Sequence, residues 1–187
     1  MRIISGQKKG RKLIGKISQS TRPATDSNRE TVFNILNNYI VLENIIVLDL
    51  FAGSGAMGFE ALSRGANHCY FIDSNKTAIE CVEKNAINLD IQKDNYIILK
   101  IDALKAIRLL SKKNLKFDLI FIDPPYRSNV VNSVLNDIVK YNLTSADAIL
   151  SIEISSKEGI DIPDEFEFIT ERQLGITKII FLKRIDK

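Results

Sequence analysis

From Ile45 onward the sequence alternates between apolar runs and amphipathic stretches, and this alternation restricts the fold more than any other feature. Five apolar runs have the length of strands, at residues 45–51, 69–72, 96–101, 117–122 and 148–154. The stretches between them carry apolar residues at helical spacing, at residues 56–64, 75–88, 103–111 and 129–141. Strands that are apolar on both faces and separated by helices form a parallel sheet that helices cover on both sides. We therefore expect a doubly wound α/β domain.

The end of the chain departs from this alternation. Residues 165–170 and 177–184 are strand-like runs with no helix between them, which predicts an antiparallel pair at the edge of a mostly parallel sheet. No composition shift after Ile45 marks a further boundary. We expect residues 1–44 to pack as an extension on a core of residues 45–187, within a single structural unit.

The start of the chain is basic and contains only short apolar runs. Two short apolar runs flank a glycine-bounded segment at residues 6–10 and predict a hairpin or a pair of extended segments around a turn. A helix follows, for which Ser27 and Glu30 have the spacing of a capping box and Asp26 is an alternative cap.

Charge is distributed unevenly along the chain. The net charge is only +3, yet residues 1–31 carry eight lysines and arginines against two acidic residues. Such a cluster is typical of a protein that binds a polyanion, because each neutralised phosphate releases counterions. Charge alone is explained equally well by a solvent-exposed face that binds nothing. Arg127 lies outside this cluster, and a mobile surface side chain explains it as well as a phosphate contact does. The candidate residues for binding such a polyanion are Lys8, Lys9, Arg11, Lys12, Arg22, Arg29 and Arg127.

Composition excludes several classes of protein. Hydrophobic residues make up 45% and charged residues 26% of the chain, as in ordinary globular proteins. No run approaches the ~20 apolar residues that span a bilayer, and the start lacks the apolar core of a signal peptide. The two cysteines lie twelve positions apart and the chain has one histidine, His68, so we expect no disulfide and no metal. We expect a cytoplasmic monomer that does not enter a membrane.

A glycine loop follows the first apolar run. Gly53, Gly55 and Gly58 form a G-x-G-x-x-G pattern between a strand and an amphipathic helix. The first two glycines leave room for a ligand beside the backbone, and the third allows close helix packing. Asp73 ends the next apolar run, where a carboxylate can accept the hydroxyl protons of a ribose. This pattern fits any cofactor that carries a nucleoside.

Asp49 distinguishes between such cofactors. An acid four positions before the first glycine favours the cationic S-adenosylmethionine over a dinucleotide, because a pyrophosphate near it would be repelled. Asp102 ends the third run and is either a contact to adenine or the N-cap of the next helix, or both. The candidate cofactor-binding residues are Asp49, Phe51, Ala52, Gly53, Ser54, Gly55, Asp73, Asp102 and Ala103.

The fourth apolar run ends in the motif Asp123-Pro124-Pro125-Tyr126, which we interpret as catalytic. Two prolines stiffen the loop and leave its carbonyl groups free to accept hydrogen bonds. The Asp123 carboxylate and the Pro124 carbonyl can accept the two protons of an exocyclic amine, which turns its lone pair toward a methyl donor. Tyr126 offers a face on which the base can stack. The alternative is that the prolines only end the strand and the tyrosine packs in the core.

Longer blocks resemble the bacterial small-subunit (16S) rRNA guanine-N2 methyltransferase family. They are RIISGQKKGRKL near the start, TRPATDSNRETVFNIL at 21–36, LDLFAGSGAMGFEALSRGA at 48–66, DPPY, and QLGIT at 173–177. The resemblance covers essentially the whole chain. It implies a Rossmann-like methyltransferase fold, S-adenosylmethionine as donor, and N2-methylguanine in ribosomal RNA or in a small-subunit assembly particle as product. It also implies that Thr21, Arg22 and Pro23 lie near the RNA entrance and that Arg29 points at RNA or braces the site.

Departures from the family pattern and rival functions remain. Ala24 replaces the usual threonine, and Ser27-Asn28 replaces a basic-aliphatic pair, which puts the RNA contacts of that helix in question. The rivals are a methyltransferase of DNA or of another RNA base or a protein amide, a non-catalytic RNA-binding protein, and a nicotinamide dehydrogenase. We expect a structural role for His68, and an ion pair for Glu153 because it lies in an apolar run.

Overall fold

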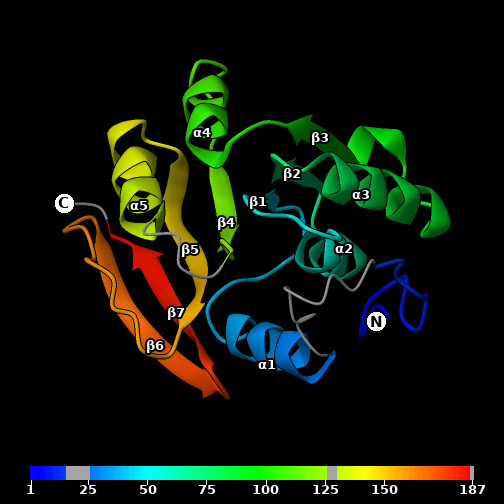
Figure 1. Ribbon diagram of the computed structural model, residues 1–187, viewed down its shortest axis with the longest axis horizontal. Coiled ribbons are helices and arrows are strands. Elements are labelled where there is room, and N and C mark those ends of the chain that lie inside the picture. Colours follow the sequence, from blue (N-terminus) through cyan, green and yellow to red (C-terminus); the bar gives the residue numbers. More distant parts are fainter. Residues whose placement is uncertain (16–25, 126–129, 186–187) are drawn as a thin grey trace.

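The computed structural model describes residues 1–15, 26–125 and 130–185. In this part of the chain a seven-stranded sheet has the order β3-β2-β1-β4-β5-β7-β6 (Figure 1). The strands are β1 (Ile46–Asp49), β2 (His68–Asp73), β3 (Tyr96–Lys100), β4 (Phe117–Ile122), β5 (Thr144–Ser155), β6 (Phe166–Leu174) and β7 (Thr177–Arg184). The helices are α1 (Asp26–Leu36), α2 (Ala56–Ser63), α3 (Lys76–Asn88), α4 (Ala103–Ser111) and α5 (Val130–Lys140), with a 3₁₀ turn η1 (Lys93–Asn95).

Strand direction confirms the architecture expected from the sequence. Strands β1 to β5 are parallel to one another, and β7 runs antiparallel between β5 and β6. The chain begins the sheet in its middle, adds β2 and β3 on one side of β1, and then adds β4 and β5 on the other side. The order therefore reverses between β1 and β4, and such a point opens a crevice at the carboxyl ends of the strands.

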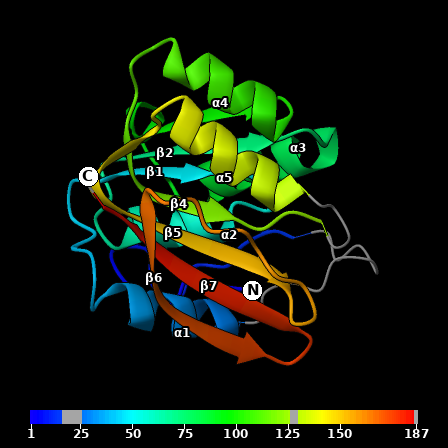
Figure 2. The ribbon, with the colours of Figure 1, turned by 90° about the vertical axis from the view of Figure 1, so that its left-hand side faces the viewer.

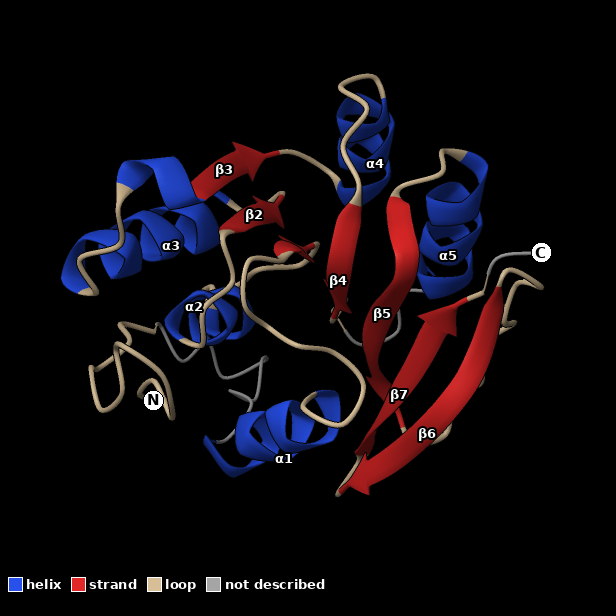
Figure 3. Cartoon of the chain, turned by 180° about the vertical axis from the view of Figure 1, so that it is seen from behind, coloured by secondary structure: helices blue, strands red, loops and turns tan. Residues whose placement is uncertain are grey.

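Helices cover both faces of the sheet, as Figure 2 and Figure 3 show from two further directions. Successive strand residues point to opposite faces. Val47, Phe71 and Phe121 pack against α1, α2 and α3, whereas Leu48 and Ile120 pack against α4 and α5. The apolar runs are buried on both faces for this reason.

Local signals in the sequence set several element boundaries. Asn75 caps α3 by accepting the Thr77 N–H at 2.8 Å. Asp102 caps α4 by accepting the N–H groups of Leu104 and Lys105, which confirms one of its two expected roles. Gly58 lets α2 pack on β2, because a Cβ there would lie 2.3 Å from a ring carbon of Phe71.

The first helix begins differently from the expectation. Ser27 lies inside α1, where its carbonyl accepts the Thr31 hydroxyl at 3.0 Å, so Ser27 is not the N-cap. Asp26 is already the first helical residue and binds the Arg2 N–H and the Arg29 guanidinium instead. The capping-box prediction was wrong because Ser27 already lies within the helix, and the alternative cap Asp26 binds Arg2 and Arg29.

The expected N-terminal hairpin is present and packs on the core. Arg2 and Lys12 form an antiparallel bridge, and the Ile3 N–H donates to the Arg11 carbonyl at 2.9 Å. Position 6 requires glycine for two reasons. Its φ is +79°, and a Cβ there would overlap the Ser63 carbonyl of α2.

A buried carboxylate joins the hairpin, α1 and α2. Glu60 of α2 is fully buried and accepts the N–H groups of Ile4 at 2.8 Å and Ser5 at 3.0 Å. It also forms ion pairs with Arg64 at 2.8 Å and with the fully buried Arg29 at 3.4 Å. A buried charge is tolerated only when such partners satisfy it.

We expect Glu60→Ala to lower the free energy of unfolding by about 3 to 5 kcal/mol, because it leaves the Arg29 charge buried with less compensation. Urea denaturation measures this change. Glu83 is exposed on α3, so Glu83→Ala should alter stability by only about 0.5 kcal/mol and serves as the control. Equal effects of the two substitutions would contradict the role of Glu60.

Candidate active site

Two loops that the sequence marks as functional meet at one edge of the sheet. The glycine loop follows β1 and the Asp123 loop follows β4, and β1 pairs directly with β4. The Leu50 N–H donates to the Phe121 carbonyl at 3.1 Å, and the Ala52 N–H donates to the Ile72 carbonyl at 2.9 Å. The carboxyl tips of β2, β1 and β4 are therefore held side by side.

The glycine loop has the backbone conformation that its sequence requires. Gly53 and Gly55 have φ values of 53° and 78°, which residues with a side chain rarely adopt. The Gly53 N–H donates to one oxygen of Asp73 at 2.9 Å, and the Asn75 N–H donates to the other oxygen at 2.8 Å. An ionised carboxylate offers about four acceptor positions, so Asp73 braces the loop and keeps capacity for a ligand.

Asp49 lies beneath this loop and is almost fully buried. It accepts the Gly58 N–H at 3.2 Å. Burial, with a smaller contribution from the negative charge of Asp73, raises the pKa of the Asp49 carboxyl to about 7 against the hydrogen bond from Gly58. A cation bound nearby would favour the ionised form, so the site is suited to a positively charged ligand.

The remaining candidate cofactor residues surround the same loop. Phe51 and Ser54 are half-buried, Ala52 is buried, and the Ser54 carbonyl accepts the amide of Asn85 in α3 at 2.9 Å. Ala103 is buried at the start of α4, beside the exposed cap residue Asp102.

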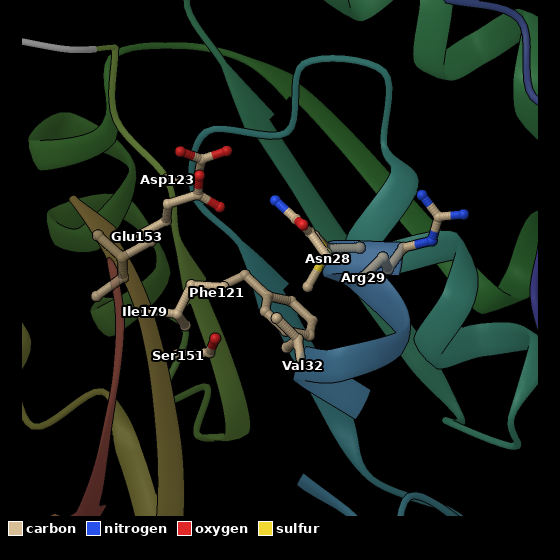
Figure 4. Close-up of a pocket in the computed structure, with 10 residues that line it drawn as sticks. Asn28, Arg29, Val32, Phe121, Asp123, Ser151, Glu153 and Ile179 are labelled. Carbon is tan, nitrogen blue, oxygen red and sulfur yellow. The ribbon is translucent and has the colours of Figure 1, made fainter. Parts of the chain in front are cut away.

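A pocket adjoins the glycine loop on the α1 side of the sheet (Figure 4). Its walls come from α1, the first turn of α2, and the ends of β4, β5 and β7. The lining residues are Asn28, Arg29, Val32, Met57, Phe121, Ile122, Asp123, Ser151, Glu153 and Ile179. Asp123 therefore faces a pocket, as the sequence predicted, and a second acid faces it too.

Strand register explains why Glu153 joins Asp123. Phe121 pairs with Ser151 and Ile122 pairs with Ile152 in parallel strands β4 and β5. Residues 123 and 153 come next on the two strands, so their side chains leave on the same face of the sheet. Figure 4 shows the two carboxyl groups next to each other at the pocket.

Mutual proximity and burial shift the ionisation of both acids. The pKa of Asp123 is raised well above its usual value, first by desolvation and then by the charges of Glu153 and Asp49. The residue as a whole is exposed at its strand tip, while atoms packed around the carboxyl desolvate it. Burial likewise raises the pKa of Glu153, against a hydrogen bond with the Thr177 side chain.

The expected ion pair of Glu153 is not found. Within the described part of the chain no lysine or arginine lies within ion-pair distance of this residue, so the prediction was wrong there. The sequence shows that Ser151 and Glu153 share one face of their strand, but only the pairing of β5 with β4 shows that this face is the one that Asp123 uses. His68 lies against Tyr70 at a ring distance of 5.0 Å, away from this pocket's lining.

The other candidate catalytic residues are placed only in part. Pro124 is buried and Pro125 is exposed at the end of β4. Tyr126, Arg127 and Arg22 lie outside the described residues, as do Thr21, Pro23 and Ala24.

The basic candidates of the hairpin lie against the end of α3. Lys9, Arg11 and Lys12 are exposed, and Lys8 donates to the Asp90 carbonyl at 2.9 Å. Arg11 donates to the Asn88 carbonyl. The carboxyl end of a helix carries partial negative charge, which favours cations there.

Arg29 is not part of this exposed basic surface. Its side chain is fully buried, pairs with Asp26 at 3.1 Å and Glu60 at 3.4 Å, and donates to the Arg2 carbonyl. Of its two expected roles, pointing at RNA and bracing the site, this placement matches the second.

Residues 1–183 match the family described as conserved hypothetical protein 95. The chain belongs to this family. A relative, ribosomal RNA small subunit methyltransferase D of Haemophilus influenzae, is 31% identical over 176 residues, which cover 94% of this chain and 90% of the relative. The family resemblance that the sequence blocks carry is thus confirmed.

Solved structures confirm the fold of this family member. The Escherichia coli protein yhhF has a TM-score of 0.87 at 29% identity, covering 100% of this chain and 99% of that one. A further solved structure, SMU.776, a putative methyltransferase complexed with SAH, has a TM-score of 0.67 at 15% identity and covers 83% of this chain and 49% of its own. The Rossmann-like methyltransferase fold predicted from the sequence is therefore confirmed.

Two further findings concern what this family member lacks. No helix in the described ranges has the length and apolar character needed to cross a membrane. In the same residues no group of three histidine, cysteine or acidic side chains is arranged to hold a metal ion.

The two acids of the pocket should cost this family member stability. We expect Glu153→Gln to raise the free energy of unfolding at pH 8 by about 0.5 to 2 kcal/mol, because it removes a charge that burial and Asp123 disfavour. A raised folded-state pKa means that the penalty is present above that pKa and fades as the pH falls through it. Urea denaturation at pH 8 and pH 4 should show a gain only at pH 8, and a loss at pH 8 would contradict the account.

Proposed function

We propose that this chain transfers a methyl group from S-adenosylmethionine to the exocyclic N2 of a guanine in 16S ribosomal RNA. The observation that carries the proposal is the pairing of β1 with β4, which puts the Asp49 glycine loop beside Asp123. Membership of a family that contains a small-subunit ribosomal RNA methyltransferase supports the substrate.

The residues around the glycine loop fit S-adenosylmethionine. Asp73 has acceptor capacity left for ribose hydroxyls, and Asp102 and Ala103 lie at the next strand end, where an adenine would follow. Asp49 favours the positive charge of the sulfonium and the α-ammonium group. A protein of the same fold was solved with SAH, the product of this donor.

Positioning is the main contribution of the pocket to the reaction. The Asp123 carboxyl and the Pro124 carbonyl accept the two N–H groups of N2, so that its lone pair faces the donor methyl group. The N2–C bond forms as the S–C bond breaks, S-adenosylhomocysteine leaves, and N2 loses one proton. Holding the two groups in line can supply ~7 to 11 kcal/mol of the barrier. The raised pKa of Asp123 makes its carboxylate a better acceptor for the released proton.

The basic hairpin supplies the RNA contacts in this proposal. Lys9, Arg11 and Lys12 are exposed next to α3, which follows the same β2 tip that carries Asp73. Phosphate groups bound there would orient the RNA without reading its sequence. We extend the proposal to a monomer in the cytoplasm that acts on ribosomal RNA or on a small-subunit assembly particle.

Methyl transfer from tritium-labelled donor tests the proposed function. Undermodified small subunits, naked ribosomal RNA and DNA are offered in parallel, and nucleoside mass spectrometry identifies the product. We expect N2-methylguanine in RNA, and a loss of about 100-fold or more in kcat with Asp123→Ala, because a hydrogen bond to a charged group and its orienting effect are removed. Glu83→Ala, on the exposed face of α3, should leave the rate unchanged.

Other outcomes of this assay would select the rival functions. Labelling of DNA alone would make the chain a DNA methyltransferase. RNA binding with no methylated base from the unmodified protein would favour the non-catalytic binding protein.

Cofactor affinity should depend on pH through Asp49. Its pKa of about 7 in the free protein means that a ligand with its α-ammonium group near Asp49 releases a proton from this carboxyl on binding below that pH. We expect S-adenosylhomocysteine to bind about tenfold more tightly at pH 8 than at pH 6, measured by calorimetry. Asp49→Asn should bind more weakly and with no such trend, and an equal pH dependence in both proteins would contradict the role of Asp49.

A further inference from the structure

We propose that Glu153 determines base specificity by accepting the N1–H of the target guanine while Asp123 holds N2. This inference rests on the proposed function and assigns a role to the second acid of the same pocket. Glu153 follows Ile152, whose partner in β4 is Ile122, so its side chain leaves the sheet beside that of Asp123.

The surroundings of Glu153 are those of a ligand contact and not of a structural ion pair. On one side Ile179 of β7 lies opposite it in the sheet, and on the other Val32 of α1 and Phe121 close the pocket. Such apolar walls limit the access of water, which strengthens any hydrogen bond made there. Within the described ranges Glu153 has no cationic partner, and the nearby Thr177 side chain lowers the pKa that burial raises.

Thr177 lies near this carboxyl on a rigid element. It is buried, it is the first residue of β7, and its hydroxyl contacts the Leu174 carbonyl at 3.1 Å across the β6–β7 turn. Thr177 also pairs with Ser155 in β5, two residues beyond Glu153. The register of β5 with β4 and with β7 therefore sets the position of the acid before any substrate arrives.

Base chemistry explains what two adjacent acceptors can recognise. Guanine presents N–H groups at N1 and at the neighbouring N2, whereas adenine has an acceptor at N1 and cytosine has one at N3. An ionised carboxylate only accepts hydrogen bonds, so Glu153 would attract the guanine edge and repel the other two. Bases that have left a stack are read by such contacts to their Watson–Crick edges.

An analogue of guanine isolates this contact. 2,6-Diaminopurine keeps the exocyclic amine at position 2 but has an acceptor at N1. The methylated position is first located by mass spectrometry, and RNA carrying guanine or 2,6-diaminopurine at that position is then assembled by ligation. Methyl transfer to each RNA is measured with the unmodified protein, with Glu153→Gln, and with Glu167→Gln as the matched control on the exposed face of β6.

A change of specificity is the expected result. The unmodified protein and Glu167→Gln should prefer guanine by roughly 10- to 100-fold in kcat/KM. Glu153→Gln should lose about tenfold on guanine and gain on 2,6-diaminopurine, because an amide can donate to N1. The inference is overturned if Glu153→Gln lowers both rates by one factor, or if the unmodified protein treats both RNAs alike.

The same experiment separates this inference from the proposed function. Methylation of guanine by the unmodified protein with no change of preference in Glu153→Gln removes only the role of Glu153. Absence of methylation in every RNA overturns the proposed function, and the role of Glu153 with it. Thermal unfolding of Glu153→Gln checks that the folded state is kept, and the loss of a buried charge should leave it intact.

Discussion

The buried carboxylate of Glu60 joins parts of the chain that are far apart in sequence. It binds the backbone of the N-terminal hairpin, the guanidinium of Arg29 in α1 and that of Arg64 in α2. Helix α2 begins at the glycine loop, and α1 forms the wall of the pocket opposite Asp123. This network therefore fixes the distance between the cofactor loop and the substrate pocket. Because the charges are buried, moving one partner away would leave another buried charge without compensation. This free-energy cost keeps the partners in place.

Negative charge accumulates at the edge where the parallel strands end. Burial raises the pKa of Asp49, Asp123 and Glu153. The charges of Glu153 and Asp49 raise the pKa of Asp123 further. A fold under selection for stability alone would not gather three acids there. A cationic donor and a base that offers N–H groups would each relieve part of this repulsion. The free energy that the repulsion costs the free protein is therefore regained in part when these ligands bind.

Much of the site could be predicted from the sequence because its signals are local. The glycine spacing, the acids that end successive apolar runs and the motif at residues 123–126 each lie within a few residues. Glu153 was misjudged because its position depends on register between β4 and β5, which no local pattern gives. Arg29 was counted among the RNA contacts for a similar reason, since only packing shows that Glu60 and Asp26 enclose it.

The sequence by itself determined the doubly wound architecture and led to the prediction of cofactor and catalytic roles for the glycine and Asp-Pro-Pro-Tyr loops. Hydrophobic periodicity and the conformational requirements of single residues are properties of a short segment, so they can be recognised in the sequence without the tertiary structure. The tertiary structure decided which side chains share a pocket and which charges are buried. Those outcomes depend on strand order, on register and on the packing of α1 over the sheet, which bring together residues more than a hundred positions apart.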